Sequence, residues 1–291
     1  MTEKPQNEDV WRSIFETGNP QLQGLRKHYD WWPAWPSYAR CRLCLLPFSG
    51  IGGVWMRRVH NWGPSGRNRH YCNKCDDFIN NNPGGAKVEM SVLFVDIRNS
   101  SGIAEKLDPA LFAKIIRRFT KIVAKTLTDE DGFIFKFSGD ALGTVYPPGF
   151  LGPVEHARRA IAGAESLLRT AMPRAPGGGE LSIGIGVHTG LTYIGTLNED
   201  EKGQDPSSEK VHEKVYDDVQ PIGDVPNVSA GLSAMGQNQA FISESTLIAA
   251  GYNSKGLKLE DVYVKSRVAP VPICKVTRQT PPLREQFGPN Q

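Results

Sequence analysis

The sequence predicts an α+β protein in which helices cover a mostly antiparallel sheet, preceded by a small cysteine-rich module. From Val88 onward, β-branched apolar runs alternate with segments whose apolar residues recur at helical spacing. Before that point, four of the five cysteines form two Cys-x-x-Cys pairs. A chain of 291 residues with 39% hydrophobic residues is long enough to bury a packed core.

The N-terminal residues 1–39 are predicted to hold a short helix and a connector. Trp11, Ile14 and Phe15 recur at helical spacing and share one face. The stretch "YDWWPAWPSYA" follows, and its prolines disfavour a helix at the residues before them. We expect the tryptophans of this connector to pack against the protein: Trp31, Trp32 and Trp35.

The cysteine-rich module is assigned to residues 40–80. The turn formers "NNNPGGA" end it and mark a domain boundary. The larger domain then spans residues 88–278, and residues 279–291 form a C-terminal tail. Residues 198–214 are charged and aperiodic, which predicts a long exposed hairpin loop.

The elements of the larger domain follow one another along the chain. Strands are predicted over residues 87–97, 132–140, 141–148, 180–190, 191–197, 240–243, 257–265 and 271–276. Helices are predicted over residues 109–127, 154–171 and 227–235. A short helix should also follow the small polar turn "IRNSSG".

The overall charge does not indicate a nucleic-acid or membrane protein, because Lys and Arg outnumber Asp and Glu only 34 to 31. No apolar run is long enough to cross a bilayer, and the polar start "MTEKPQNED" lacks the features of a secretory signal. We therefore expect a cytoplasmic protein without a membrane span.

The two cysteine pairs predict a metal site. Their spacing is Cys-x2-Cys-x27-Cys-x2-Cys, and two such pairs can place four thiolates around one Zn²⁺. Four thiolates leave no position for substrate, so the zinc would be structural; a redox dithiol or an iron–sulfur cluster is the alternative. The four ligands would be Cys41, Cys44, Cys72 and Cys75. Cys274, in "APVPICKV", is expected to be a buried strand residue.

The module is also locally basic, since no acidic residue occurs from Arg40 to Lys74. Positive charge beside aromatic side chains suits single-stranded nucleic acid, so a nucleic-acid face is a competing hypothesis. Small zinc modules are often basic simply to balance their thiolates, and we regard nucleic acid as the less favoured partner.

Two aspartates at strand ends predict a second metal site. Asp96 ends the run "SVLFVD", and Asp140 lies at the tip of the hairpin "FKFSGDALG", where Gly139 permits a tight turn. Carboxylates from adjoining strand ends suit Mg²⁺ or Mn²⁺ with a triphosphate. The backbone N–H groups of the turn after Asp96, which contains Asn99 and Ser100, can cradle phosphate. The alternative for each aspartate alone is a turn residue that bonds its own backbone.

These motifs resemble those of the class III nucleotidyl cyclases, in which an F-x-D-I strand and a K-F-x-G-D hairpin carry the metal-binding aspartates. The matching residues are Phe94, Asp96, Ile97, Lys136, Phe137, Gly139 and Asp140. Further similar segments follow in the same order: "GIGVHTG", "IGDVPNVSAGL", "AFISEST" and "VYVKSRVAPVPICKV". The resemblance covers about residues 88–278, and the "CRLCLLPF" knuckle looks like zinc modules that precede some bacterial cyclases.

The resemblance implies a ferredoxin-like catalytic fold that forms a head-to-tail homodimer, with the substrate sites at the interface. One protomer would bind two Mg²⁺ or Mn²⁺ ions through Asp96, Ile97 and Asp140. Its partner would contribute Lys136 and Gln220 to the base, Asn227 to the ribose and transition state, and Lys265 to the phosphates. The implied reaction converts a nucleoside triphosphate to a 3′,5′-cyclic nucleotide and pyrophosphate.

The chain departs from the family pattern at Gly231, where the family has an arginine that stabilises charge on the α-phosphate. Such a donor is worth about 3 to 4 kcal/mol, so a slow enzyme or an inactive nucleotide sensor stays open. Arg98 or a residue of loop 198–214 is a candidate replacement. Gln220 stands where the family has Asp or Thr for ATP, and its amide can face several bases. We favour ATP, with a pyrimidine nucleotide of antiviral signalling as the alternative.

Overall fold

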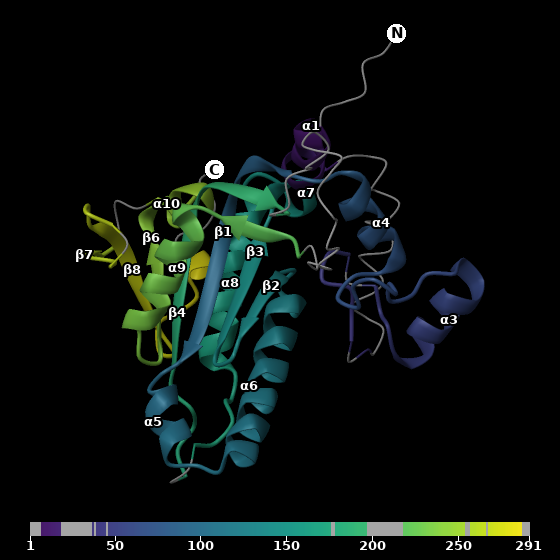
Figure 1. Cartoon of the computed structure of the whole chain (residues 1–291). Coiled ribbons are helices and arrows are strands. Elements are labelled where there is room, and N and C mark those ends of the chain that lie inside the picture. Colours follow the sequence, from purple (N-terminus) through teal and green to yellow (C-terminus); the bar gives the residue numbers. More distant parts are fainter. Residues whose placement is uncertain are drawn as a thin grey trace, which may run out of the picture. The chain divides into compact units, whose positions relative to one another are not determined.

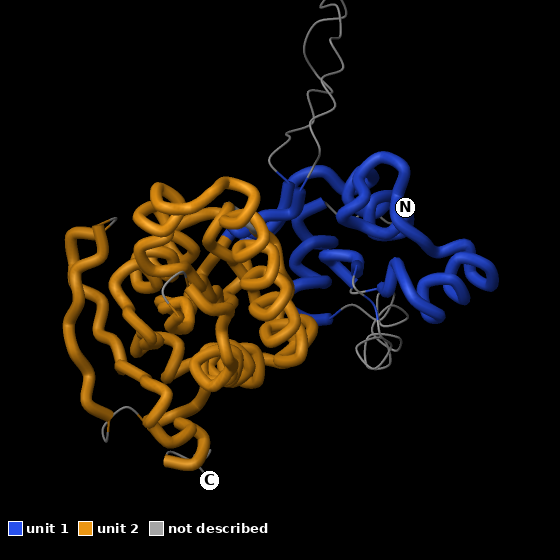
Figure 2. Tube along the Cα trace, turned by 90° about the horizontal axis from the view of Figure 1, so that it is seen from below, with its two compact units in different colours: residues 1–87, 193–221 blue, residues 88–192, 222–291 orange. Residues whose placement is uncertain are grey.

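The computed structural model describes residues 7–18, 37, 39–44, 46–175, 178–196, 218–253, 257–265 and 267–286. The predicted packing of Trp31, Trp32 and Trp35 and the predicted loop 198–214 lie outside these residues. The chain divides into two compact units, shown in blue and orange in Figure 2. Unit 1 comprises residues 1–87 and 193–221, and unit 2 comprises residues 88–192 and 222–291. Among the described residues, no helix combines the length and apolarity that a bilayer crossing needs.

A sheet of eight strands forms the centre of the fold (Figure 1). The strands are β1 (Gly85–Ile97), β2 (Phe133–Ser138), β3 (Ala141–Tyr146), β4 (Ile183–Gly195), β5 (Gln220–Ile222), β6 (Gln239–Ser243), β7 (Leu259–Val262) and β8 (Val271–Thr277). Their order is β2-β3-β1-β4-β6-β8-β7, and β5 pairs with β4 beside this path. The pairs β1–β3, β2–β3, β6–β8 and β7–β8 are antiparallel, whereas β4–β6 is parallel.

Helices of unit 2 pack on both faces of this sheet. The main core lies between one face and the helices α6 (Pro109–Asp129), α8 (Glu155–Arg169) and α10 (Glu244–Ala249). Helix α9 (Asp224–Met235) packs through Val228 and Leu232 in a second cluster that includes Phe241. Because Ala240 and Ile242 belong to the main core while Phe241 does not, the two clusters occupy opposite faces of β6.

Helix α6 begins at a side-chain cap that the sequence provides. The side chain of Asp108 accepts hydrogen bonds from the backbone N–H groups of Ala110 and Leu111 at the start of α6, with Pro109 at the first helical position. The described residues of unit 2 also form three shorter helices: α5 (Ser100–Glu105), α7 (Pro148–Leu151) and α11 (Leu283–Gln286). The last lies in the predicted tail, where the backbone N–H of Leu283 donates to Glu165 Oε1 at 2.8 Å.

The predicted fold class is confirmed, as are the three predicted long helices and the buried position of Cys274 in β8. The predicted break between strands 180–190 and 191–197 is wrong, because β4 runs without interruption through Gly190 and Leu191. Its neighbour β1 also has 13 residues, so the pairing extends through the polar segment that resembles a turn in the sequence.

Unit 1 has short helices at its N-terminus and in the cysteine-rich module. Helix α1 (Asn7–Arg12) continues as the π-helix η1 (Ser13–Thr17). The predicted helix is thus present, and its residues Trp11, Ile14 and Phe15 are buried. The Trp11 indole donates to the carbonyl of Asn82 at 2.7 Å. The module holds α3 (Gly50–His60) and α4 (Asn73–Asn81), which the sequence analysis does not predict.

Candidate functional site

The two predicted metal carboxylates lie at the same edge of the sheet. Asp96 is the penultimate residue of β1, and its partner across the ladder is Ala141, the residue after Asp140. The backbone N–H of Ile97 donates to the carbonyl of Asp140 at 3.2 Å. Gly139 has φ of +59°, a left-handed conformation that glycine adopts readily, so the β2–β3 turn is tight enough to hold Asp140 beside the end of β1.

The electrostatics of this pair suit a cation. Partial burial raises the pKa of Asp96, the adjacent Arg98 lowers it, and the charge of Asp140 raises it again. One oxygen of each carboxylate already accepts a hydrogen bond: Oδ2 of Asp96 lies 2.7 Å from Arg98 Nη2, and Oδ2 of Asp140 accepts from the hydroxyl of Ser100. The remaining carboxylate oxygens are hard donors of the kind that bind Mg²⁺ or Mn²⁺.

The other predicted residues of this edge differ in what they can offer. The side chain of Ile97 is buried in the core, so only its backbone carbonyl can reach a metal ion. Asn99 is exposed and adopts a left-handed conformation with φ of +56°. The structure therefore brings Asp96, Asp140 and Ser100 together, with Asn99 at the adjoining turn.

The residues predicted for base, ribose and phosphate contacts come from four elements. Lys136 is exposed on β2, and Gln220 is half-buried at the start of β5. Asn227 is exposed in the first turn of α9, and Lys265 is exposed in the turn after β7. The last two elements touch each other, because Gly231 of α9 packs against Val264, which precedes Lys265.

This contact explains the glycine at position 231. A Cβ atom added there would lie 2.1 Å from Val264 Cγ1, and Val264 is only 3% exposed. A real Cβ does not approach another carbon so closely, so an arginine at this position requires Val264 to move. Helix α9 therefore supplies no cation at this point.

A cation that the sequence analysis did not select lies on the neighbouring loop. Arg267 Nε is 3.3 Å from the carboxylate of Asp224 in the first turn of α9, and the Arg267 backbone N–H donates to the carbonyl of Val264 at 2.9 Å. Arg98, which the sequence analysis did consider, is held by Asp96 and by the backbone carbonyl of Ala234. The sequence offered one indication of a role for Arg267, namely its position two residues after Lys265.

The four cysteines of unit 1 form a compact cluster that fits a tetrahedral metal site. Their sulfur atoms all lie within 4.8 Å of one another and all four residues are buried. Cys44 Sγ and Cys72 Sγ are 3.7 Å apart, close to the edge of about 3.8 Å in a tetrahedron with zinc–sulfur bonds of about 2.3 Å. Backbone N–H groups of Cys72 and Cys75 donate to sulfur atoms of the cluster.

The environments of the thiols differ within the cluster. Hydrogen bonds from neighbouring thiols, that of Cys41 first, lower the pKa of Cys72, whereas burial raises the pKa of Cys44. A bound cation is what permits several buried thiols to ionise together.

Two histidines belong to a buried chain of hydroxyl groups and not to an open site. His188 Nδ1 lies 2.9 Å from Ser243 Oγ, and His156 Nδ1 lies 3.1 Å from Ser91 Oγ. Thr189 and Thr246 connect these two ends. Burial is the main cause that lowers the pKa of each histidine to about 4. His188 is therefore held by hydrogen bonds within this network and is not part of the predicted nucleotide site.

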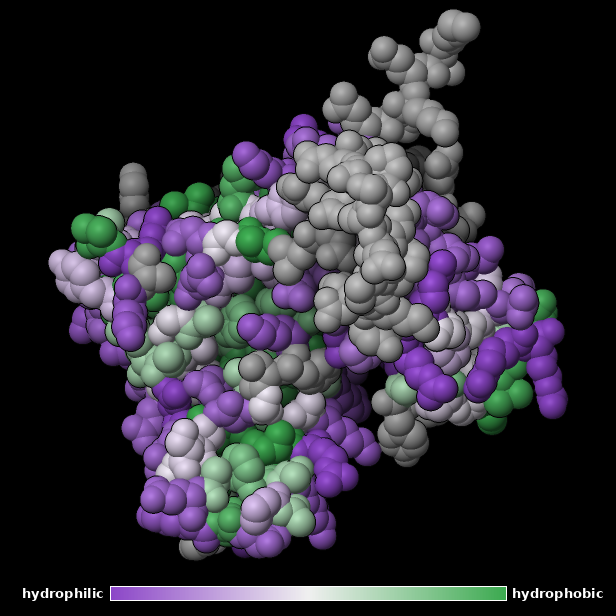
Figure 3. All heavy atoms as spheres, in the orientation of Figure 1, coloured by the Kyte–Doolittle hydropathy of each residue, from purple (hydrophilic) through white to green (hydrophobic). Residues whose placement is uncertain are grey.

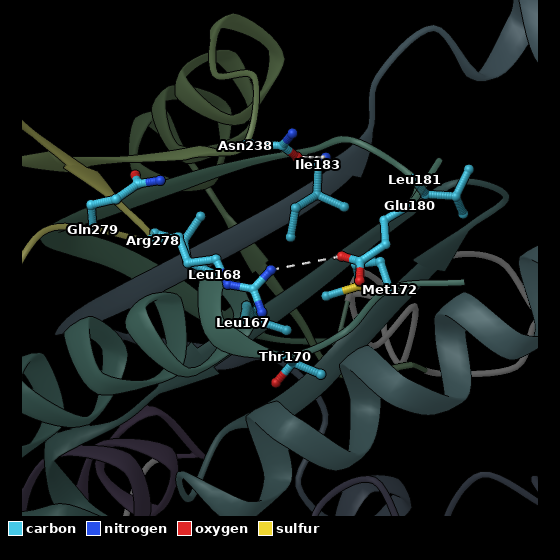
Figure 4. Close-up of a pocket in the computed structure, with 10 residues that line it drawn as sticks. All are labelled: Leu167, Leu168, Thr170, Met172, Glu180, Leu181, Ile183, Asn238, Arg278 and Gln279. Carbon is cyan, nitrogen blue, oxygen red and sulfur yellow. Dashed lines mark hydrogen bonds and ion pairs between the residues drawn. The ribbon is translucent and has the colours of Figure 1, made fainter. Parts of the chain in front are cut away.

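A separate cavity of about 220 Å³ lies in unit 2 (Figure 4). Apolar side chains such as Leu167, Met172 and Ile183 line it, and Arg278 reaches across to Glu180, with Nη1 and Oε2 3.9 Å apart. None of the site residues predicted from the sequence is among its described lining residues. This cavity is therefore not the predicted nucleotide site.

The chain is similar in sequence and in fold to known nucleotide cyclases. The chain is 28% identical to an adenylate cyclase of Anabaena cylindrica over 114 residues, which are 37% of this chain and 22% of that protein. The solved guanylyl cyclase Cya2 matches with a TM-score of 0.52 and 24% identity over 66% of this chain and 93% of that one. The adenylyl cyclase CyaB from P. aeruginosa matches with a TM-score of 0.51 and 19% identity over 68% and 98%.

No family model matches the chain. The matching region spans only about a fifth of the curated adenylate cyclases. The solved structures nevertheless show the fold: about two thirds of the chain has the architecture of a class III nucleotidyl cyclase domain. The resemblance found in the sequence is thereby confirmed.

Proposed function

We propose that the chain is a nucleotidyl cyclase that converts a nucleoside triphosphate, with ATP favoured, to a 3′,5′-cyclic nucleotide and pyrophosphate. The observation that carries this proposal is the placement of Asp96 and Asp140 at one sheet edge within a cyclase fold. Residues 88–278 would form the catalytic domain, and residues 40–80 a structural module with one Zn²⁺ bound by four cysteines.

Asp96 and Asp140, with the backbone carbonyl of Ile97, would hold two Mg²⁺ or Mn²⁺ ions. Bound there, the ions would lower the pKa of the ribose 3′-hydroxyl and neutralise charge on the phosphates. The chain's own contribution is to fix both carboxylates. Arg98 holds one oxygen of Asp96, and Ser100 holds one oxygen of Asp140, which would leave the opposite oxygens available as metal ligands.

A second copy of the chain would complete each site in a head-to-tail homodimer. Its Lys136 and Gln220 would contact the base, Asn227 the ribose, and Lys265 the phosphates. Exposure of Lys136, Asn227 and Lys265 in the single chain is compatible with such a shared site. Asn99 and Ser100, at the turn after β1, would adjoin the phosphates from the first copy.

The charge that develops on the α-phosphate needs a cation, and Val264 excludes one from position 231. We assign this role to Arg267, because it shares a loop with Lys265 and pairs with Asp224, one helical turn before Asn227. The side chains of Arg267 and Asp224 are 36% and 50% exposed, so their ion pair can rearrange when a phosphate approaches.

Two alternatives share the same site. The first is a nucleotide sensor with little or no turnover. The absence of space for an arginine at position 231 favours this alternative. The second is a pyrimidine cyclase, because the Gln220 amide donates or accepts according to its orientation.

Incubation of the purified chain with Mn²⁺ and each of the four nucleoside triphosphates, followed by mass spectrometry, separates these functions. A cyclase produces cyclic nucleotide and pyrophosphate in equal amounts. Binding without product, in a preparation shown to be dimeric, identifies the sensor. A cyclic pyrimidine nucleotide as the main product identifies the second alternative.

A further inference from the structure

The cysteine cluster and the short strand that carries Gln220 are joined by a set of polar contacts within unit 1. Asp218, two residues before Gln220, is the centre of this set. Its Oδ2 lies 3.3 Å from Arg42 Nη1, and its Oδ1 accepts a hydrogen bond from Asn68 Nδ2 at 3.2 Å. His70 Nδ1 lies 3.5 Å from the same Oδ1. We call these contacts the Asp218 clamp.

The clamp also holds the backbone of the next residue. The N–H of Val219 donates to the hydroxyl oxygen of Tyr71 at 2.9 Å, and both residues are buried. Asp218 and Val219 are thus fixed through a carboxylate and through the main chain, directly before Gln220.

The residues of the clamp are positioned by the cysteine cluster. Arg42 follows Cys41, and Tyr71 precedes Cys72, whose N–H donates to Cys41 Sγ at 3.2 Å. The two cysteine loops are also joined directly, because the Arg42 N–H donates to the His70 carbonyl at 2.9 Å. A metal ion that ties the loops together therefore also sets the spacing of the groups that grip Asp218.

Strand β5 depends on such support. It has only three residues and pairs with β4 beside the main path of the sheet. So short a strand does not fix its own register, and the direction of a side-chain amide follows the backbone that carries it. Among the described residues, the contacts of the Asp218 clamp hold the chain in place on the N-terminal side of Gln220.

We propose that Asp218 is a positioning residue for recognition of the base: it transmits the order of the metal-bound cysteine module to Gln220. This inference rests on the proposed function of Gln220. The cysteine module would then contribute to substrate selection as well as to stability. If the module loosens, the Gln220 side chain can adopt several orientations, and the protein discriminates less well among bases.

The test uses the whole 291-residue, zinc-loaded chain with Asp218→Asn, which removes the charge but keeps the size. Tyr71→Phe releases Val219 without changing the carboxylate, and Asp218→Glu tests rescue by a conservative side chain. The matched control is Glu260→Gln, which breaks an exposed ion pair with Lys275 in unit 2. Hydrogen exchange is followed by mass spectrometry, and kcat and KM are measured with all four nucleotides.

Asp218→Asn and Tyr71→Phe should each raise exchange at residues 218–222 by about tenfold, while the rest of the chain keeps its protection. KM for the preferred nucleotide should rise, kcat should stay within about twofold, and the preference among nucleotides should narrow. Zinc removal with a chelator should raise exchange at the same residues, and Asp218→Glu should restore part of the preference.

Unchanged exchange at residues 218–222, or loss of kcat with an unchanged preference, overturns the inference. The same holds if Glu260→Gln has equal effects, or if zinc removal leaves residues 218–222 protected. Failure of the proposed function is distinguishable, because it appears as no turnover of any nucleotide by the unmodified chain. Exchange still reports in that case whether the clamp exists.

Discussion

The contact between Gly231 and Val264 makes a quantitative prediction about unit 2. Gly231→Ala adds a methyl group 2.1 Å from Val264 Cγ1, and overpacking of this kind costs roughly 1 to 3 kcal/mol. Alanine is preferred over glycine inside a helix by about 1 kcal/mol. The free energy of unfolding should therefore fall by roughly 0 to 2 kcal/mol, the clash outweighing the helix propensity.

A second substitution removes the cause. Val264→Ala deletes Cγ1, so Gly231→Ala in that background should raise the free energy of unfolding by about 1 kcal/mol. The change in the effect of Gly231→Ala between the two backgrounds should be roughly 1 to 3 kcal/mol. Gly179→Ala is the control, because a Cβ at Gly179 meets no atom within 4 Å.

Urea unfolding should be followed by far-ultraviolet circular dichroism. All six tryptophans lie between Trp11 and Trp62, so tryptophan fluorescence reports unit 1 and not the helix that carries Gly231. An equal effect of Gly231→Ala in both backgrounds would refute the argument that Val264 closes position 231. A Gly231→Arg variant with restored fast turnover and unchanged stability would refute it as well.

Three further predictions concern the other sites. Arg267→Ala should lower kcat about a hundredfold with little change in KM, whereas Arg278→Ala, at the separate cavity, should leave both unchanged. The purified chain should contain one zinc ion, measured with a chromogenic chelator; Cys72→Ser should lose it and Cys274→Ser should retain it. The depressed pKa values of His156 and His188 predict that stability is full above pH 6.5 and is lost as the pH falls toward 4, by about 3 kcal/mol for each histidine in urea titrations.

Each of these predictions would be contradicted by a specific result. Unchanged turnover in Arg267→Ala would remove that residue from the phosphate site. Zinc retained by Cys72→Ser would show that the cluster is not the ligand set. For the histidines, unfolding binds protons between pH 6.5 and 4, so stability must rise with pH there. A flat profile, or one identical after His156→Gln and His188→Gln, would contradict the depressed pKa values.

Local patterns in the sequence predicted the sheet, the long helices and the aspartate motifs. Strands and helices can be predicted from the short-range periodicity of apolar residues. The resemblance to cyclases was recognised from the motifs and their order along the chain. The continuous strand β4 was missed because the polar residues around Gly190 resemble a turn. Only pairing with the equally long β1 shows that the strand extends through them.

Contacts between segments far apart in the chain could not be predicted from the sequence patterns. Gly231 is visible as an exception to a family motif, but its cause is Val264, 33 residues further along the chain. The Asp218 clamp joins residues separated by as many as 176 positions. Nothing in the residues around Arg42 or Asp218 alone indicates that they meet, because only the tertiary fold brings their loops together.

Binding of Mn²⁺ tests the central claim most directly, because it requires no turnover. Calorimetric titration of Mn²⁺ into the chain, with an unreactive triphosphate analogue present, compares Asp96→Asn, Asp140→Asn and the exposed control Asp129→Asn. A shared site predicts that each of the first two variants weakens binding at least about tenfold, that their combination adds little, and that Asp129→Asn has no effect. Unchanged Mn²⁺ affinity in either Asp96→Asn or Asp140→Asn would contradict the assignment of these carboxylates as one metal site.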